Sequence, residues 1–230
     1  MDWYTLLILI NAKRCWLKMN KIYTIGHSTH LVDKFYELLK RSGINVVVDV
    51  RSVPFSQFAD QYNKDNLMLF LQRNNILYIH MGNLLGARYD DSSLLFSDGK
   101  VDFEKVVKTK EFIEGINRIN EGLSKGYNIA LMCSERNPLE CHRFSMISYF
   151  LDSHGYDVQH ILPEKVISHK LLEDKLFNFF KGSQKISLEL DKILNMTATQ
   201  KSLFFNPSKS DLYLCLNKMV AFNPYAVKGE

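Results

Sequence analysis

Short apolar runs alternate with helix-like spacings of apolar residues along most of this chain. Residues 44–50 form a nearly unbroken run rich in valine, which is typical of a strand buried on both faces of a parallel sheet. Apolar residues from Leu31 to Leu39 recur on one helical face, and Ser42-Gly43 ends that helix. The predicted strands are 21–25, 44–50, 76–80, 127–132 and 156–162, with helices between them and the last two helices over 137–155 and 164–181.

This rhythm predicts an α/β fold, a single three-layer domain with a mainly parallel five-stranded sheet of Rossmann-like type. The common strand order 3-2-1-4-5 would place strands one, two and four side by side, with a reversal between strands one and four. Ligands bind outside the carboxyl ends of the strands at such a point. The stretch 82–102, rich in Gly, Asp and Ser, is predicted to be a long loop with a function or high mobility.

The rhythm covers residues 19–182, which we take as the domain. Residues 1–18 are expected to be an extension upstream of the natural start, because Met19 directly precedes the first convincing strand. Their apolar run precedes its positive charges and no small-residue cleavage site follows, so a signal peptide is not expected. Residues 183–230 are expected to form a C-terminal extension, helical near 186–194.

Three polar clusters follow three of the predicted strands, and their joint position at neighbouring carboxyl ends is the main indication of a site. The substrate-binding candidates are Ser28, Asp49, Arg51, Ser56, Arg88 and Arg143. The catalytic candidates are His27, Cys133, Glu135, Cys141 and His142.

The first two clusters suggest proton transfer and anion binding. His27 has an imidazole suited to acid–base work, and the alternative interpretation is a turn histidine with one structural hydrogen bond. Asp49 and Arg51 alternate along a strand and should point the same way. Arg51 is expected either to clamp a phosphate or carboxylate or to form a structural ion pair with Asp49.

The third cluster is the most informative. Asn137 and Pro138 predict a helix start, which would place Cys141, His142 and Arg143 in its first turn. Positive charge there opposes the helix dipole, so a carboxylate or a bound anion should compensate for Arg143. Adjacent residues on a helix diverge by about 100°. We therefore expect Cys141 and His142 to point apart, and a cysteine–histidine pair to join Cys133 or Cys141 to His27.

No cofactor is expected, and a metal site on Cys133, Cys141 and His142 is an alternative, although their spacing is not a recognised zinc pattern. The net charge of +4 permits a nucleic-acid partner without arguing for one. Four scattered cysteines fit a reducing, cytoplasmic environment, and no apolar run approaches the roughly 20 residues that cross a membrane. Walker, G-x-G-x-x-G and G-x-S-x-G motifs are absent from the sequence.

Together the clusters resemble domain-of-unknown-function family 488. The resemblance rests on four segments: Thr24-Ile25-Gly26-His27-Ser28, Asp49-Val50-Arg51-Ser52-Val53-Pro54, Leu84-Leu85-Gly86-Ala87-Arg88, and Leu131-Met132-Cys133-Ser134-Glu135 with Cys141-His142-Arg143. It covers about residues 21–175 and implies a small bacterial or archaeal α/β protein without a settled reaction. Ala87 stands where the family often has a second glycine.

The residues favour an enzyme that acts on a small anionic, nucleotide-like or phosphate-bearing substrate, with a nucleic acid as an open alternative partner. Arginines would bind the anionic group, a histidine would move a proton, and Glu135 or Asp49 would orient it. Cys133 or Cys141 would be the nucleophile. A non-catalytic module that binds an anion or nucleic acid is the second hypothesis, and a metal-binding protein is the third.

Overall fold

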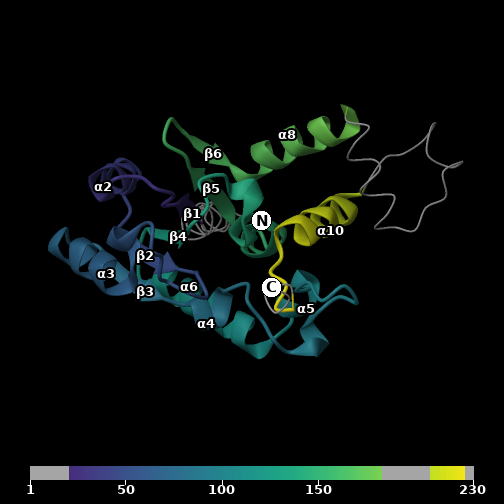
Figure 1. Cartoon of the computed structure of the whole chain (residues 1–230). Coiled ribbons are helices and arrows are strands. Elements are labelled where there is room, and N and C mark those ends of the chain that lie inside the picture. Colours follow the sequence, from purple (N-terminus) through teal and green to yellow (C-terminus); the bar gives the residue numbers. More distant parts are fainter. Residues whose placement is uncertain (1–20, 183–207, 226–230) are drawn as a thin grey trace, which may run out of the picture.

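A computed structural model describes residues 21–182 and 208–225 (Figure 1). Within these ranges six strands form one sheet in the order β3-β2-β4-β1-β5-β6, and every neighbouring pair is parallel except β5 with β6. No helix in these ranges is long and apolar enough to span a membrane.

The strands are β1 (Lys21–Gly26), β2 (Val46–Asp49), β3 (Leu77–His80), β4 (Ile129–Cys133), β5 (Asp157–Ile161) and β6 (Val166–Ser168). The longer helices are α2 (Val32–Arg41), α3 (Lys64–Arg73), α6 (Lys110–Ser124), α8 (His169–Gly182) and α10 (Lys209–Val220). Shorter helical segments are η1 (Asp60–Tyr62), α4 (Gly82–Leu85), η2 (Ser92–Leu94), α5 (Phe103–Val106), η3 (Pro138–Glu140), η4 (Arg143–Ser148) and α7 (Tyr149–Ser153). The predicted long loop 82–102 thus contains two short helical turns, α4 and η2.

The predicted α/β architecture is confirmed, but the predicted order of the central strands is wrong, because β4 lies between β2 and β1. The sequence does not distinguish the two orders, since every residue of β2 and β4 is buried and most of β1 is too. The chain still reverses between β1 and β4. The helix after β1 packs on one face of the sheet, and the helix after β4 packs on the other. The switch point therefore lies where we expected it.

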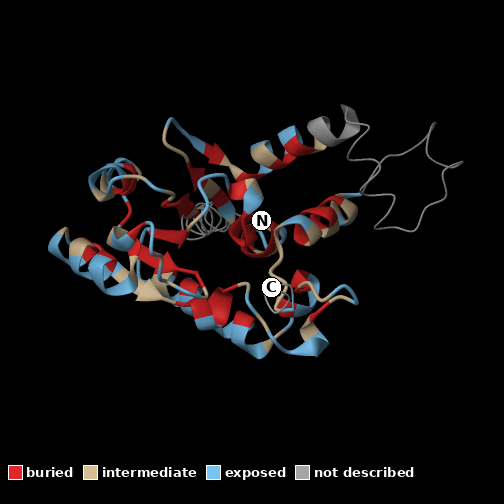
Figure 2. Ribbon diagram, viewed as in Figure 1, coloured by how far each residue is buried: buried red, intermediate tan, exposed pale blue. Residues whose placement is uncertain are grey.

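Two apolar cores cover the two faces of the sheet, which gives the three layers. Successive residues of β2 point to opposite faces, so Val47 packs with α2 and α3 while Val46 and Val48 pack with α6. Phe35 of α2 and Phe112 of α6 are both fully buried. Figure 2 shows the resulting pattern, with buried residues along the strands and exposed residues on the outer sides of the helices.

The predicted helix over 164–181 begins later than expected, because residues 166–168 form a sixth strand. The Leu162 amide donates to the Lys165 carbonyl at 2.8 Å, which closes a turn, and β6 then pairs antiparallel with β5. A Pro-Glu turn followed by Val166 and Ile167 is the signal for this short hairpin.

The C-terminal helix α10 packs on the domain. Leu212 and Leu216 join Phe144 and Leu176 in a third apolar cluster. A capping box starts α10, since Ser208 Oγ accepts from the Asp211 amide at 3.2 Å and the Asp211 carboxylate accepts from the Ser208 amide at 2.9 Å. The expected extension 1–18 and the expected helix near 186–194 lie outside the described residues.

Candidate functional site

The carboxyl ends of β1, β2 and β4 lie side by side, which brings the three polar clusters together. Gly26 is in register with Cys133, and Asp49 with Met132. The loop after β1 stays close to β4, because the His27 amide donates to the Cys133 carbonyl at 3.0 Å. The site is therefore assembled by sheet topology from residues about 100 positions apart in the sequence.

Gly26 permits this close approach. A Cβ at Gly26 would overlap the backbone carbonyl of Glu135 and lie 3.0 Å from Nη2 of Arg143. We expect Gly26→Ala to lower the free energy of unfolding by about 1–3 kcal/mol, measured by urea denaturation, because the loop after β4 must move. Gly122→Ala is the matched control, since its Cβ would meet only the flexible end of Ile129. Its stability should be unchanged or higher. Equal stability of Gly26→Ala and wild type would contradict this account.

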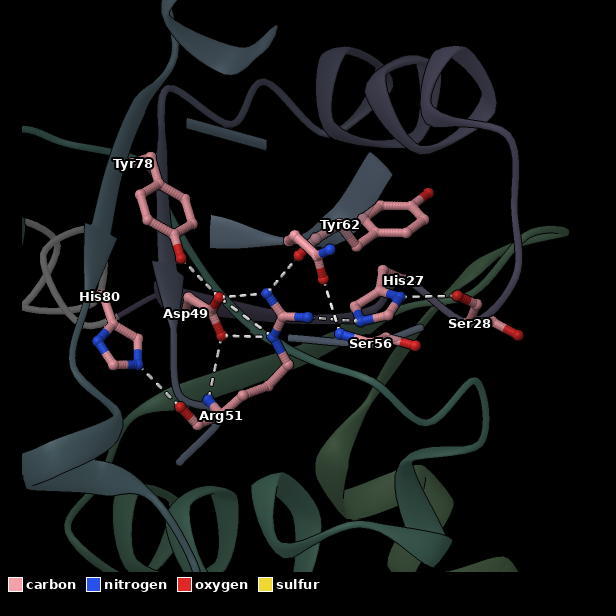
Figure 3. Close-up of polar contacts among 9 residues, drawn as sticks. His27, Ser28, Asp49, Arg51, Ser56, Tyr62, Tyr78 and His80 are labelled. Carbon is pink, nitrogen blue, oxygen red and sulfur yellow. Dashed lines mark hydrogen bonds and ion pairs between the residues drawn. The ribbon is translucent and has the colours of Figure 1, made fainter. Parts of the chain in front are cut away.

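A buried ion pair lies beneath the site (Figure 3). Arg51 Nε donates to both Asp49 oxygens at 2.9 and 3.1 Å, and Arg51 Nη2 donates to Oδ2 at 2.5 Å. Asp49 is 0 % exposed and Arg51 is 4 % exposed. Burial alone would lower the pKa of Arg51, but the bonds to Asp49 outweigh this effect and raise it. The expectation that the two side chains point the same way is confirmed, and their pairing is the structural one.

His27 belongs to the same network. Arg51 Nη1 donates to Nε2 of His27 at 3.0 Å, His27 Nδ1 donates to the Ser28 carbonyl at 2.7 Å, and the ring stacks on Tyr62 at 4.1 Å. Both ring nitrogens are therefore occupied. The expected pairing of His27 with a cysteine is not what the structure shows, because Arg51 and the Ser28 carbonyl occupy its two ring nitrogens.

The pKa of His27 predicts an acid-sensitive fold. Burial, together with the charge of Arg51, lowers this pKa from 6.5 to about 4. An unfolded histidine takes up its proton near pH 6.5, whereas the folded one stays neutral to about pH 4, so stability present above pH 6.5 is lost as the pH falls. From pH 7 to pH 5, His27 should cost about 2 kcal/mol. Urea denaturation at pH 7 and pH 5 should show that the free energy of unfolding of His27→Asn falls by about 2 kcal/mol less than that of wild type. An identical fall in both proteins would refute this assignment.

Tyr62 and Tyr78 complete the network through contacts that the sequence did not reveal. Tyr78 Oη donates to Asp49 Oδ2 at 2.7 Å, and the Tyr62 carbonyl accepts from Arg51 Nη2 at 2.8 Å. His80 Nε2 lies 2.9 Å from the Arg51 carbonyl. Tyr78 and His80 alternate along β3, next to β2, so their polar side chains in a strand were the available signal.

The thiols and imidazole of Cys133, Cys141 and His142 form a second group, which we call the Cys-Cys-His cluster. His142 Nδ1 lies 3.7 Å from both sulfurs, and the three side chains are buried. This corrects the expectation that Cys141 and His142 diverge. Pro138 starts only the short turn η3, Cys141 is extended with φ −140° and ψ 142°, and the next helix begins after it. The 100° rule holds within a helix, and Cys141 lies outside one.

Cys141 caps the helical segment that continues through η4 and α7. Its sulfur accepts from the Arg143 amide at 3.4 Å, and its carbonyl accepts from the Phe144 amide at 3.0 Å. The first turns of this segment are π-helical, a form that often marks functional sites. A thiol at a helix N-terminus is placed to carry negative charge.

The two cysteines differ in acidity. Burial would raise the pKa of Cys141, but the hydrogen bond from Cys133 and the charges of Arg143 and His142 hold it well below the usual value. The hydrogen bond to Cys141, together with burial, raises the pKa of Cys133. Burial alone would lower the pKa of His142, but the charge of the Cys141 sulfur and its hydrogen bond outweigh this effect and raise it. These shifts favour negative charge on Cys141, whose sulfur lies 3.7 Å from Nδ1 of His142.

Arg143 holds the loop after β4 from below. Its Nη1 donates to the Glu135 carbonyl at 2.6 Å and its Nη2 to the Arg136 carbonyl at 3.1 Å, and the residue is 1 % exposed. The compensation that we expected for its charge comes from two carbonyl dipoles and the nearby Cys141 sulfur. This arginine positions Glu135 and does not line the pocket that opens over the Cys-Cys-His cluster.

A pocket of about 240 Å³ opens over the Cys-Cys-His cluster, and we call it the switch-point pocket. Six of the eleven predicted site residues line it, namely Arg51, Arg88, Cys133, Glu135, Cys141 and His142. Its walls are formed by Arg51, Ser52, Val53, Ala87, Arg88, Cys133, Ser134, Glu135, Glu140, Cys141, His142, Val220 and Phe222. A larger pocket of about 430 Å³ lies between α5, α7 and α10, but none of the predicted site residues lines it.

These observations can be compared with known proteins. A family model described as "Domain of unknown function DUF488" matches residues 31–150, which is more than half of the chain. The chain belongs to the DUF488 family. The match confirms the resemblance noted from the sequence, and it includes β2, β4 and the Cys-Cys-His cluster. No curated protein and no solved structure matches the chain.

Two predicted substrate-binding serines of this DUF488 domain lie away from the pocket wall. Ser28 adopts a left-handed backbone with φ 50°, and its carbonyl accepts from His27. The Ser56 amide donates to Asn63 Oδ1 at 2.7 Å, and its hydroxyl accepts from the Phe58 amide at 3.2 Å. Their contacts shape the loops after β1 and β2.

The sequence did not reveal two further contributions to the DUF488 site. Ser52 Oγ accepts from the amides of Ala87 and Arg88 at 3.0 and 3.1 Å, which fixes one pocket wall against another. Phe222, just after α10, lies under the Arg88 guanidinium at 4.9 Å. Ser52 lies beside Arg51 in the second cluster, which was a usable signal, whereas no local pattern marks Phe222.

Proposed function

We propose that this protein is an enzyme acting on a small anionic substrate of nucleotide-like or phosphate-bearing type in the switch-point pocket. The observation that carries the proposal is the convergence of chemically different groups on one pocket. Two thiols, an imidazole, two carboxylates and two arginines reach it from the end of β4 and from the loops after β2, β3 and β4. Such a convergence at a switch point is typical of α/β enzymes.

Arg88 is the group we assign to the anion. It is exposed at the pocket wall, and its guanidinium lies over the ring of Phe222. Its backbone is held by Ser52, so the arginine starts from a fixed point. When a guanidinium stacks on an aromatic ring, its N–H donors, which lie in the plane of the guanidinium, stay free for a phosphate or carboxylate.

The size and walls of the pocket favour a small ligand or one end of a larger one. At about 240 Å³ it lies below the range of roughly 300–1,000 Å³ that is usual for drug-sized ligands. Phe222 and Val220 add an apolar side that suits a sugar or base. The buried cation Arg143 lies behind the floor and favours negative charge above it.

Glu135 is the group that we assign to proton transfer. Its backbone carbonyl is fixed by Arg143 at 2.6 Å, and its side chain lines the pocket beside Cys141. A carboxylate held at the wall of a pocket, next to the reactive sulfur and imidazole, can take up or deliver the proton of a reacting group.

The proposal is tested by incubating the protein with a metabolite extract and following all compounds by mass spectrometry. Wild type should consume at least one phosphate-bearing compound that Cys141→Ser leaves unchanged, and Cys215→Ser, altered in α10 away from the pocket, should behave as wild type. Consumption of no compound, or equal consumption by Cys141→Ser, contradicts the proposal. Binding of a phosphate compound by wild type without its consumption would identify a binding module instead.

A further inference from the structure

The Cys-Cys-His cluster has the geometry of a metal site. The sulfurs of Cys133 and Cys141 and Nδ1 of His142 all lie within 4.8 Å of one another, and each sulfur is 3.7 Å from the nitrogen. Zinc binds sulfur at about 2.3 Å and nitrogen at about 2.0–2.1 Å. A tetrahedral angle between these bonds gives a sulfur–nitrogen separation of about 3.6 Å. The observed distances match it.

The contacts of His142 point to the same conclusion. The residue is 8 % exposed, so its imidazole is shielded from water. One Nδ1 placed at equal distance from two sulfurs cannot make a good hydrogen bond to both of them. It is well placed to direct its lone pair at a cation that both sulfurs also contact.

The local backbone explains how neighbours in sequence can share an ion. Cys133 ends β4, Cys141 is extended before the helix, and His142 begins it, so the three side chains approach from different directions. The Arg143 amide donates to Cys141 Sγ at 3.4 Å, and such a bond favours the thiolate that a metal requires.

We infer that Cys133, Cys141 and His142 bind one zinc ion, with the fourth coordination position open to the switch-point pocket. Two thiolates and one imidazole are a soft, tetrahedral donor set that selects zinc. Three protein ligands with one open position are the arrangement of catalytic rather than structural zinc sites. The inference deepens the proposed function, and the catalytic meaning of the ion rests on that proposal.

A second group of potential ligands in the described residues differs in one decisive way. Asp152, His169 and Glu173 also converge, but Lys209 Nζ lies 2.8 Å from Glu173 and 3.3 Å from Asp152. The ammonium group of α10 therefore already supplies a cation there. No comparable cation contacts both sulfurs of the Cys-Cys-His cluster in the described residues, so within residues 21–182 and 208–225 we assign zinc to this cluster alone.

The test is the zinc content of the full-length protein purified without chelator, measured by plasma mass spectrometry. About one zinc per chain is expected in wild type and in Cys215→Ala, and a clear loss in Cys133→Ser and Cys141→Ser. The second readout uses wild type alone, so that it does not depend on the folding of either serine variant. Replacing zinc by Co²⁺ should give the thiolate charge-transfer and tetrahedral d–d absorption bands.

Two results would overturn the zinc inference. One is wild-type protein without zinc that gives no thiolate absorption bands with Co²⁺. The other is a disulfide between Cys133 and Cys141 in protein that turns over a substrate without metal. The second result would still support the proposed enzyme. Conversely, one bound zinc per chain without turnover of any anionic compound would support the zinc site and contradict the proposed function.

Discussion

Replacing Asp49 by asparagine is expected to lower the free energy of unfolding by about 3–5 kcal/mol. Asparagine keeps the shape of the side chain but removes the charge that compensates for Arg51 and turns one acceptor into a donor. Arg51 Nε and Nη2 and the Tyr78 hydroxyl all donate to this carboxylate, which is 0 % exposed. A buried guanidinium left without its counter-charge costs far more than the net contribution of the pair.

The measurement for Asp49→Asn is urea denaturation at pH 7, and Asp157→Asn is its control. Asp157 forms an exposed ion pair with Lys21 at 3.9 Å, with side chains 45 % and 44 % exposed. A pair of this kind contributes about 0–1 kcal/mol, so the control should stay close to wild type. A loss below about 1 kcal/mol for Asp49→Asn would mean that the network beneath the pocket does not stabilise the loops around it.

Replacing Glu135 by glutamine is expected to lower kcat on the substrate found by the turnover screen by about 10²–10⁴-fold. The amide keeps the size and the backbone position fixed by Arg143 but cannot take up a proton. KM should change little, because Arg88, the group assigned to the anion, is not altered, and zinc should stay bound because all three residues of the Cys-Cys-His cluster are retained. This split separates a lost proton transfer from a collapsed site.

Glu164→Gln is the matched control for Glu135→Gln. Glu164 is an exposed carboxylate outside the pocket, bonded to Arg136 at 3.0 Å in the same part of the molecule. Its kcat and KM should equal those of wild type. A loss of less than tenfold in Glu135→Gln, or an equal loss in Glu164→Gln, would remove Glu135 from the chemistry.

The fold class follows from the sequence because strand and helix periodicities differ. Val46, Val47 and Val48 are all buried since both faces of β2 are covered, and such a run is readable without a structure. The order of β4 and β1 is not readable, because both strands are apolar enough to be central. The short strand β6 was not predicted, because its three residues are too few to show the alternation of apolar and polar positions typical of a strand.

The site was predictable as far as strand ends could be recognised. Asp49, Arg51, Cys133 and Cys141 converge because parallel strands end at one edge of the sheet. Their detailed pairing depends on local backbone that periodicity does not encode. The extended conformation of Cys141 turns its sulfur toward His142. The contact of Arg88 with Phe222 depends on the packing of α10 against the domain.

The most direct test of the central claim is native mass spectrometry of Glu135→Gln after exposure to a metabolite extract. This variant should bind substrate and turn it over slowly. The account predicts a species heavier than the polypeptide plus zinc by the mass of a phosphate-bearing compound. That species should disappear when Arg88→Ala is added and persist when the exposed Arg73 of α3 is replaced instead. A spectrum with no such species, or one in which Arg88→Ala leaves it intact, would contradict the assignment of this pocket to an anionic substrate.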